Sequence, residues 1–339
     1  MKRSRSTSFE NSRGSSTGGA LPLIPAQKAK SLEKAGYRII GGHSAVKVCH
    51  WSKKSLLDEG VCYKEIFYGD DLGIRSHRCL QITPSLPFCD HRCTFCWRDT
   101  ELTRGTWEGD ADDPSLIIDG AIRAQRILLS GFGGNSRVNR RKFKEAMNPT
   151  QCAISLAGEP TLYPRINELV DECNKRKMTT FIVTNGQHPE VLERLNPTQL
   201  YVSVVAPDED TYMRVCNPVD GHGWEKLIES LSILSEASCR RAIRLTMARG
   251  VNMKEPEKYA RLIELSGADF VEVKAYMFVG FSRKRLEIQN MPSHAEIKDF
   301  ASKLSRLTGY SLVHECEPSR AVLLKKNKNE KVAGLACSS

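Results

Sequence analysis

Residues 79–96, with the sequence CLQITPSLPFCDHRCTFC, join an apolar run to three closely spaced cysteines. We predict a strand over 79–86, followed by a loop that presents Cys89, Cys93 and Cys96. Three thiolates this close can hold three corners of a cubane iron–sulfur cluster, which leaves one iron with an open position. Structural zinc is the second interpretation and unliganded thiols are the third. Zinc needs a fourth protein ligand, and the nearest candidate, His91, lies inside the loop, where reaching the same ion would strain the chain.

The chain on either side of this loop alternates between strand-like and helix-like patterns. Further strands are predicted over 152–158, 178–186, 199–207, 241–250 and 270–280, and helices over 113–130, 163–177, 188–195, 222–237, 256–266 and 293–308. Six βα units in sequence predict an α/β fold with a parallel sheet. A doubly wound sheet and a partial (βα)6 barrel of the TIM type both fit this alternation. In either one, ligands gather where strands end, and the polar residues there are Glu159, Thr184, Asn185 and Asp208.

Composition indicates a folded, basic protein. Of the 339 residues, 40% are hydrophobic and 27% are charged, which excludes wholesale disorder. The formal net charge of +10 favours a polyanionic partner, with nucleic acid ahead of a membrane surface. No stretch has the roughly 20 apolar residues of a membrane span, and no signal peptide is visible, so we expect a cytoplasmic protein without membrane contact. The densest basic run predicts phosphate contacts by Arg137, Arg140, Arg141 and Lys142. A solvated helical face is an equally good interpretation of this run.

Twelve cysteines in an intracellular protein indicate metal binding or catalysis more than disulfides. Six of them lie between residues 49 and 96. The other six are spread thinly and default to buried small hydrophobes or surface thiols: Cys152, Cys173, Cys216, Cys239, Cys316 and Cys337.

The cysteine loop, with Phe95 just before its last cysteine, resembles the radical S-adenosylmethionine (SAM) superfamily. This resemblance implies a [4Fe–4S] cluster on Cys89, Cys93 and Cys96. Its open iron chelates SAM, and its reduced form cleaves the cofactor to a 5′-deoxyadenosyl radical. Gly158 and Glu159, within Ala157-Gly-Glu-Pro160, resemble the element that contacts the methionine amino group. Asn185 and Ser203 resemble positions that contact the ribose or the carboxylate.

Three upstream cysteines narrow the resemblance. Cys49, Cys62 and Cys79 are 13 and 17 residues apart, and taken alone they would be three separate buried cysteines. Together with GIRSHRCLQ (73–81) and SLAGEPTLYP (155–164), they resemble the tRNA 4-demethylwyosine synthases over about residues 45–320. That resemblance implies a second [4Fe–4S] cluster on these cysteines, which binds pyruvate. It also implies a catalytic lysine two residues after the middle cysteine, Lys64, as a Schiff base or an acid–base group.

The implied reaction is that of a radical SAM carbon–carbon lyase of wybutosine biosynthesis. It condenses pyruvate with 1-methylguanosine, 3′ of the anticodon of tRNA-Phe, into the tricyclic base 4-demethylwyosine. A base splayed out of the loop needs aromatic stacking partners, for which Trp97 and Tyr276 are the candidates. The alternatives are a radical SAM enzyme with an auxiliary cluster for another RNA or a small molecule, and a zinc-stabilised RNA-binding module without catalysis.

The resemblance also sets the expected organisation. We expect a disordered basic Ser/Gly-rich tail over 1–35, an N-terminal extension with the second-cluster cysteines over 36–78, a core over 79–320 and a basic C-terminal tail over 321–339. For the core, the resemblance implies the partial (βα)6 barrel. The chain resembles the stand-alone archaeal type, so we expect a monomer whose electron donor is a separate flavodoxin- or ferredoxin-like protein.

Overall fold

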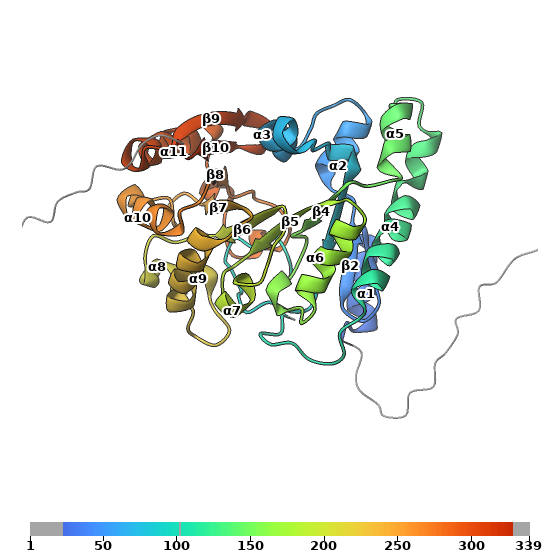
Figure 1. The fold of residues 1–339 in the computed structure, drawn as a ribbon, viewed down its shortest axis with the longest axis horizontal. Helices are drawn as coiled ribbons and strands as arrows, with labels where there is room; N and C mark the ends of the chain where they lie inside the picture. Colours follow the sequence, from blue (N-terminus) through green and yellow to red (C-terminus); the bar gives the residue numbers. More distant parts are fainter. Residues whose placement is uncertain (1–22, 102, 328–339) are drawn as a thin grey trace, which may run out of the picture.

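The computed structural model describes residues 23–101 and 103–327, which form one continuous ten-stranded sheet flanked by helices (Figure 1). The strands are β1 (Tyr37–Ile40), β2 (Ser44–Lys47), β3 (Cys79–Thr83), β4 (Gln151–Ile154), β5 (Thr179–Thr184), β6 (Gln199–Ser203), β7 (Arg240–Met247), β8 (Phe270–Ala275), β9 (Ser311–Cys316) and β10 (Ala321–Lys325). The helices are α1 (Ala26–Lys34), α2 (His50–Leu56), α3 (Tyr63–Leu72), α4 (Pro114–Leu129), α5 (Arg140–Ala146), α6 (Ile166–Lys175), α7 (Pro189–Leu192), α8 (Glu209–Cys216), α9 (Trp224–Glu236), α10 (Pro256–Ser266) and α11 (His294–Thr308). Across the described ranges, no helix combines the length and the apolar character that crossing a membrane requires.

The sheet has the order β1-β2-β3-β4-β5-β6-β7-β8-β10-β9. Strands β3 to β8 are all parallel and neighbour one another in chain order, while β1, β2, β9 and β10 add antiparallel pairs at the two edges. A doubly wound sheet reverses its strand order in the middle. The unidirectional order therefore rules out the doubly wound alternative for this chain.

The helices cover the parallel strands one after another. Helix α4 packs on α6, α7 on α9, α9 on α10, and α10 on α11 (Figure 1). Local sequence sets their starts: Asp113 accepts a hydrogen bond from the Ser115 backbone at the start of α4, and Ser293 and Glu296 form a reciprocal capping box at the start of α11. Strands β4 and β6 are buried along almost their whole length, as expected for strands covered on both faces.

All six predicted parallel strands and all six predicted helices are present. All six strands end earlier than the sequence suggested; for example, β4 stops at Ile154 rather than at residue 158. The residues beyond these ends leave the sheet and form the loops of the site described below. The sequence patterns did not predict nine further elements, which are short or polar: α1, α2, α3, α5, α8, β1, β2, β9 and β10.

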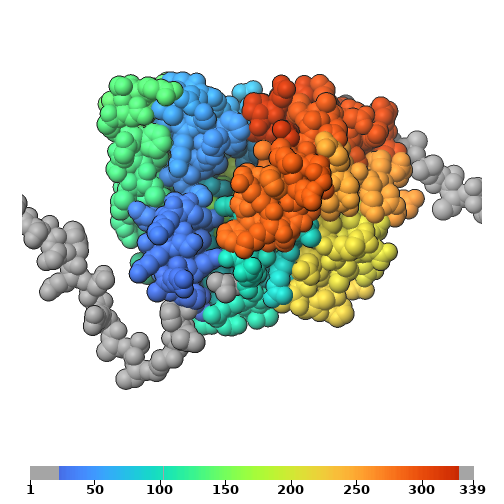
Figure 2. All heavy atoms as spheres, turned by 180° about the vertical axis from the view of Figure 1, so that it is seen from behind, coloured from blue at the N-terminus to red at the C-terminus, as the bar shows by residue number. Residues whose placement is uncertain are grey.

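Both predicted tails need correction. Residues 26–34 form helix α1, where Leu32 packs near Tyr37 and Lys28 forms an ion pair with Asp99. Residues 321–325 form the buried strand β10, which pairs with β8 and β9, because AVLL is an apolar run that the following lysines obscured. Figure 2 shows the N-terminal segment beside the segments near residues 100 and 280. Residues 1–22 and 328–339 lie outside the described residues.

Candidate functional site

A cavity of about 560 Å³ opens where the parallel strands end. Each of β4 to β8 contributes a residue at or just past its end: Ser155, Asn185, Ser203, Thr246 and Ala275. The loop after β3 contributes Cys89, Cys93 and Cys96, and Cys49 comes from the segment just before α2. Because one cavity meets all these strand ends, the residues predicted from the sequence for cofactor binding lie on a single surface.

Gly158 allows the cysteine loop to pack against the end of β4. Its φ is +67°, and a Cβ atom there would lie 1.8 Å from the Ser85 carbonyl oxygen and 2.5 Å from the Phe88 oxygen. The next backbone N–H, that of Glu159, donates to the Phe88 oxygen over 2.8 Å. Only glycine fits this position, both for its left-handed backbone and for the space available.

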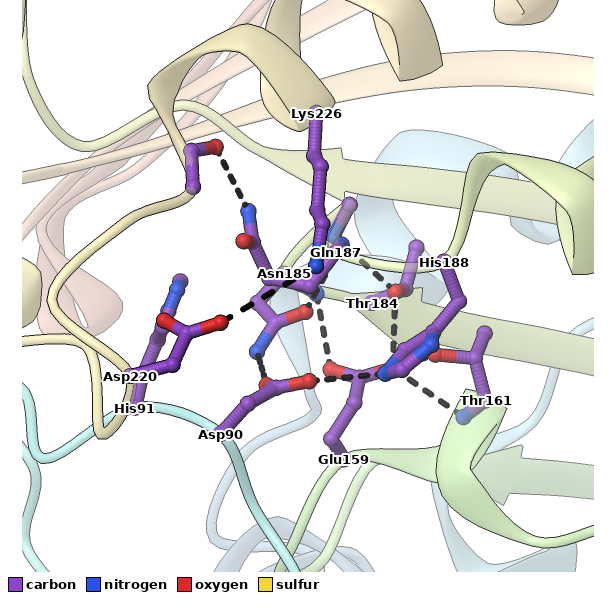
Figure 3. A network of polar contacts seen from close by, with 12 residues as sticks. Asp90, His91, Glu159, Thr161, Thr184, Asn185, Gln187, His188, Asp220 and Lys226 are labelled. Carbon is purple, nitrogen blue, oxygen red and sulfur yellow. Dashed lines mark hydrogen bonds and ion pairs between the residues drawn. The ribbon is translucent and has the colours of Figure 1, made fainter. Parts of the chain in front are cut away.

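Glu159 is buried and accepts four hydrogen bonds (Figure 3). Its Oε1 accepts from the Thr161 backbone at 3.1 Å and from the Thr161 and Thr184 hydroxyls at 2.7 Å, while Oε2 accepts from the Asn185 backbone at 2.8 Å. Burial and the nearby Asp90 raise the pKa of Glu159. Since Oε1 is fully engaged and Oε2 has a single protein donor, Oε2 is the atom left to accept from a ligand amine.

Asp90, within the cysteine loop, ties that loop to the end of β5. Its carboxylate accepts from the Asn185 side chain and lies 2.7 Å from His188 Nε2 (Figure 3). Burial opposes the charge, yet hydrogen bonding to His188 keeps the pKa of Asp90 below its usual value. The pKa of His188 is raised, since the Asp90 carboxylate outweighs its burial. Both pKa shifts favour an ionised pair, which ties the cysteine loop to the end of β5.

The cysteine loop also places a cation beside its sulfur atoms. Burial works against the charge of Arg98, but Cys96 and Cys89 keep its pKa above the usual value. Burial and the neighbouring Asp90 carboxylate raise the pKa of Cys89 well above normal. The raised pKa of Cys89 favours its protonated thiol, so a metal that binds there must displace that proton.

The three upstream cysteines converge from separate elements. Cys49 and Cys62 are the residues just before α2 and α3, and Cys79 opens β3. The Ser76 hydroxyl accepts from the Cys62 backbone at 2.8 Å, which brings the start of α3 to the turn before β3. Burial, with Cys49 as the next cause, raises the pKa of both Cys62 and Cys79 to about 12. Cys49 acts on the pKa of both Cys62 and Cys79, so the three thiols lie within electrostatic range of one another.

A cluster of charged residues lies beside this trio. Glu272 on β8 is fully buried, accepts two hydrogen bonds from Arg244 on β7 (3.0 and 2.9 Å), and accepts one from Tyr68 at 2.9 Å. Lys64 places its amine over the rings of Phe181 and Tyr201, at 4.7 and 5.0 Å. Burial, then Arg244, lowers the pKa of Lys64.

Lys274, also on β8, lines the cavity together with Arg244. Burial and Arg244 lower the pKa of Lys274 to about 8. Glu272 therefore faces three basic side chains. Since Arg244 already pairs with Glu272, any protonated fraction of Lys64 or Lys274 leaves an excess of positive charge, which suits a small anionic substrate.

Two family models match the chain: the radical SAM superfamily over residues 83–263 and wyosine base formation over residues 265–326. A relative from Pyrococcus horikoshii, named S-adenosyl-L-methionine-dependent tRNA 4-demethylwyosine synthase, is 50% identical over 325 residues and covers 93% of each chain. A relative of the same name from Methanocaldococcus jannaschii is 39% identical, over 91% of this chain and 99% of its own. The chain belongs to the tRNA 4-demethylwyosine synthase family.

Solved structures of the family share the fold. A structure of TYW1 with a lysine–pyruvate adduct bound has a TM-score of 0.81 at 39% identity and covers 89% of this chain and 96% of its own. A crystal structure of archaeal TYW1 has a TM-score of 0.72 at 35% identity, with the same coverage. The mixed α/β fold with its parallel sheet is thus that of the 4-demethylwyosine synthase family.

The donor sets suit the iron–sulfur chemistry of this family better than zinc. Sulfur atoms around one zinc ion, with bonds of about 2.3 Å, lie roughly 4 Å apart. Among the described residues, neither trio of cysteines has all its sulfur atoms within 4.8 Å of one another. One group does meet that distance, namely His91, Cys93 and Cys216, but it includes only one cysteine of the motif, and His91 Nε2 also lies 2.7 Å from the Tyr212 hydroxyl.

The structure does not bring the predicted basic run to the synthase cavity. Helix α5 and the residues before it are largely neutralised: Arg137 pairs with Glu59, and Lys142 pairs with Asp58 at 2.7 Å. Arg140 donates to the Gly133 oxygen at 2.6 Å, and Arg141 lies 3.9 Å from Glu145. None of the four lines the cavity.

The two aromatic candidates do line the cavity, but they differ in exposure. Trp97 is 38% exposed, whereas Tyr276 is buried and donates its hydroxyl hydrogen to Ser282 at 3.0 Å. Of the two, Trp97 has the face available for a base.

Sequence reasoning missed the charged residues of the strands and part of the cysteine loop. Arg244, Glu272 and Lys274 interrupt apolar strands, which is a recognisable signal, since a charge inside a buried strand needs a partner or a site. Asp90, His188 and Arg98 gave no such signal. The thinly spread cysteines were predicted to be buried small hydrophobes or surface thiols: Cys152, Cys173, Cys216 and Cys316 are buried, Cys239 is half-buried, and Cys337 lies outside the described residues.

Proposed function

We propose that the chain uses radical SAM chemistry to condense pyruvate with 1-methylguanosine of tRNA-Phe, forming 4-demethylwyosine as a carbon–carbon lyase. Family membership supports the reaction, and the observation that carries it is the position of Lys64. This lysine lies beside the upstream cysteines, with aromatic rings under its amine and a lowered pKa. Relatives bear the name of this synthase, and a solved relative contains a lysine–pyruvate adduct.

Two iron–sulfur clusters are part of the proposal. Cys89, Cys93 and Cys96 would hold one cluster and Cys49, Cys62 and Cys79 the other; when bound, the first supplies the electron that cleaves SAM and the second supplies a Lewis-acidic iron for pyruvate. Gly158, Glu159, Asn185 and Ser203 would bind SAM. The free position on Glu159 Oε2 is assigned to the methionine amino group, and the fixed backbone of Gly158 sets its distance from the cysteine loop.

Lys64 is the proposed nucleophile toward pyruvate. Its lowered pKa increases the fraction of neutral amine, which is the form that attacks the ketone. The amine nitrogen bonds to the keto carbon, the keto oxygen leaves as water, and a Schiff base remains. Arg244 and Lys274, both on the cavity wall, would neutralise the pyruvate carboxylate.

The architecture around this chemistry is proposed to be a partial (βα)6 barrel over 79–320. The sequential order of β3 to β8 and the single cavity that meets the ends of β4 to β8 support this. A separate flavodoxin- or ferredoxin-like electron donor, a monomeric state, a cytoplasmic location and phosphate contacts by the basic run remain predictions. A second radical SAM substrate class, another RNA or a small molecule, is the competing function.

Trapping with labelled pyruvate tests the proposal. Reconstituted enzyme is incubated with isotope-labelled pyruvate, reduced with cyanoborohydride and digested, and the modified peptide is sequenced by mass spectrometry. The expected result is one label on Lys64, none in Lys64→Arg, and a label still on Lys64 in Lys274→Arg, the matched variant of the neighbouring lysine, which keeps its charge. A label on Lys274, or on neither lysine, would overturn the assignment.

Product formation tests the substrate separately. Reduced enzyme with SAM, pyruvate and tRNA-Phe containing 1-methylguanosine should yield the tricyclic base by mass spectrometry of nucleosides. SAM cleavage without any tricyclic base would favour the competing function. An iron content of about eight per chain, four for each cubane, is expected after anaerobic reconstitution. A content of about four irons per chain would contradict the second cluster.

A further inference from the structure

A second cavity, of about 430 Å³, lies beside the mouth of the first. Three segments that are distant in sequence form its walls: α1 with the residues around it, the end of the cysteine loop, and the 3₁₀ turn Gly280–Lys284. These are the segments that lie side by side in Figure 2. The two cavities share Lys47, Trp97 and Arg98, so they adjoin along this wall.

The walls are fixed by specific contacts. Lys28 on α1 forms a 2.6 Å ion pair with Asp99 at the end of the cysteine loop. The Phe281 backbone donates to the Trp97 oxygen at 2.9 Å, and a Cβ atom on Gly280 would lie only 2.2 Å from the same oxygen. The 3₁₀ turn and α1 are thereby both held to the cysteine loop, and the cavity is a built feature between them.

The cavity combines flat aromatic rings with cations. Trp97 and Tyr37 are stacked with ring centroids 6.4 Å apart and planes at 23°, and the Lys47 amine lies 4.7 Å from the Tyr37 ring centroid and 5.3 Å from that of Trp97. The Lys28 amine lies 5.5 Å from the Phe281 ring. Of the four cations in the lining, Lys28 pairs with Asp99 and Arg104 with Glu108, so among the described residues Lys47 and Arg98 are the two without a carboxylate partner.

These properties match a single nucleotide. Single-stranded nucleic acids are bound by aromatic faces that stack on bases and by cations that neutralise the phosphates. An apolar peptide would use the rings but would leave the excess of positive charge unpaired. A free phosphate would use the cations but not the rings.

We propose that this second cavity holds the unstacked base of the nucleotide next to the guanosine that is modified. The inference rests on the proposed function, because it needs the guanosine in the large cavity. A base can enter that cavity only by leaving its stack, which also frees one face of its neighbour. The shared wall of Lys47, Trp97 and Arg98 places the second cavity within reach of the adjacent nucleotide.

Abasic RNAs test the site without altering the protein. Anticodon stem–loop RNAs carry 1-methylguanosine and lack the base on its 5′ or its 3′ side, and their dissociation constants are compared with that of the complete RNA. One of the two should bind about 5- to 100-fold more weakly, the range expected for the loss of a stacked base. Equal binding of all three RNAs would overturn the proposal.

A cavity-filling variant connects that loss to this cavity. Ser31 on α1 lines the cavity, and Gln27 on the same helix does not, so Ser31→Trp is compared with Gln27→Trp, which changes no charge either. Ser31→Trp should bind the complete RNA as weakly as the abasic one, with no further loss on the abasic RNA, while Gln27→Trp should match the wild type. Wild-type binding by Ser31→Trp would place the base elsewhere.

Two readouts separate this inference from other failures. SAM cleavage without RNA should be unchanged in both variants, which shows that the site is folded, and formation of the tricyclic base by the wild type tests the proposed function independently. If Ser31→Trp slowed only reduction by a protein electron donor and left RNA binding intact, the cavity would belong to that partner and the proposal would be wrong.

Discussion

Of the glycines near the site, Gly158 should be the one whose replacement with alanine damages the site most. Two costs add at this position. A left-handed backbone costs a non-glycine residue about 1–2 kcal/mol, and the new Cβ would lie 1.8 Å from the Ser85 oxygen and 2.5 Å from the Phe88 oxygen. Both neighbours are backbone atoms, so the segment from Ser85 to Phe88 must move, which costs about 1–3 kcal/mol in a packed interior.

The movement also breaks the hydrogen bond from the Glu159 backbone to the Phe88 oxygen. A buried donor left unpaired costs about 1–3 kcal/mol, so the total is about 3–8 kcal/mol. For a chain of this size, at about 2 °C per kcal/mol, that corresponds to a fall of about 6–16 °C in the melting temperature. Because Glu159 shifts with its backbone, SAM binding should weaken as well.

Two glycine variants separate the causes. Gly250 has a φ of +72° with no atom within 4 Å of an added Cβ, so Gly250→Ala carries the backbone cost alone, about 2–4 °C. Gly134 has neither feature, and Gly134→Ala should melt like the wild type. Melting temperature, iron content and SAM affinity are measured on all three reconstituted proteins. If Gly158→Ala lost no more than Gly250→Ala, the close approach would not be what makes glycine necessary.

Three further results are expected. Cys93→Ala should abolish 5′-deoxyadenosine formation, whereas Cys62→Ala should leave SAM cleavage largely intact and stop the tricyclic product; identical behaviour would contradict separate tasks for the two trios. The raised pKa of His188 means that its pairing with Asp90 stabilises the fold fully below about pH 6.5 and loses that contribution as the pH rises through the raised value. The gap in melting temperature between the wild type and His188→Gln should therefore shrink from acidic to alkaline pH, and a constant gap would refute the pairing. Glu272→Gln should lower the unfolding free energy by about 3–5 kcal/mol, since it leaves buried cations uncompensated; a denaturant titration showing less than about 1 kcal/mol would contradict this.

The regular part of the fold was predictable because each parallel strand is a short apolar run between polar loops. The strand at 199–207 illustrates both the success and its limit. Its apolar run continues to Ala206, yet β6 stops at Ser203 and the remaining apolar residues are buried outside the sheet. An apolar run in the sequence shows which residues are buried, but buried residues continue past the point where the strand's backbone hydrogen bonds end. The predicted ends were therefore too late.

The basic run over 137–144 shows what a count of charges cannot predict. Its partners Asp58 and Glu59 are about 80 residues away in the sequence and meet it only after folding. The cations around the second cavity show the reverse. Lys47 and Arg98 are distant from each other in the sequence, and the fold brings both to the wall that the two cavities share. A high density of charge in the sequence shows only how many charged residues are present, whereas the binding of an anion depends on which of these charges have no partner in the folded protein.

The sequence shows that β7 and β8 contain charged residues, but which of them pair can be predicted only when the register of the two strands is known. Arg244 and Glu272 are directly opposed in the parallel pairing of these strands, as are Thr246 and Lys274. Side chains two residues apart on a strand share a face, so this register puts all three charges on the same side of the sheet. A shift of one residue would turn Arg244 or Glu272 into the helical layer, where neither would find a partner. The ion pair therefore fixes the register of β7 against β8, and the register in turn places Lys274 on the cavity wall.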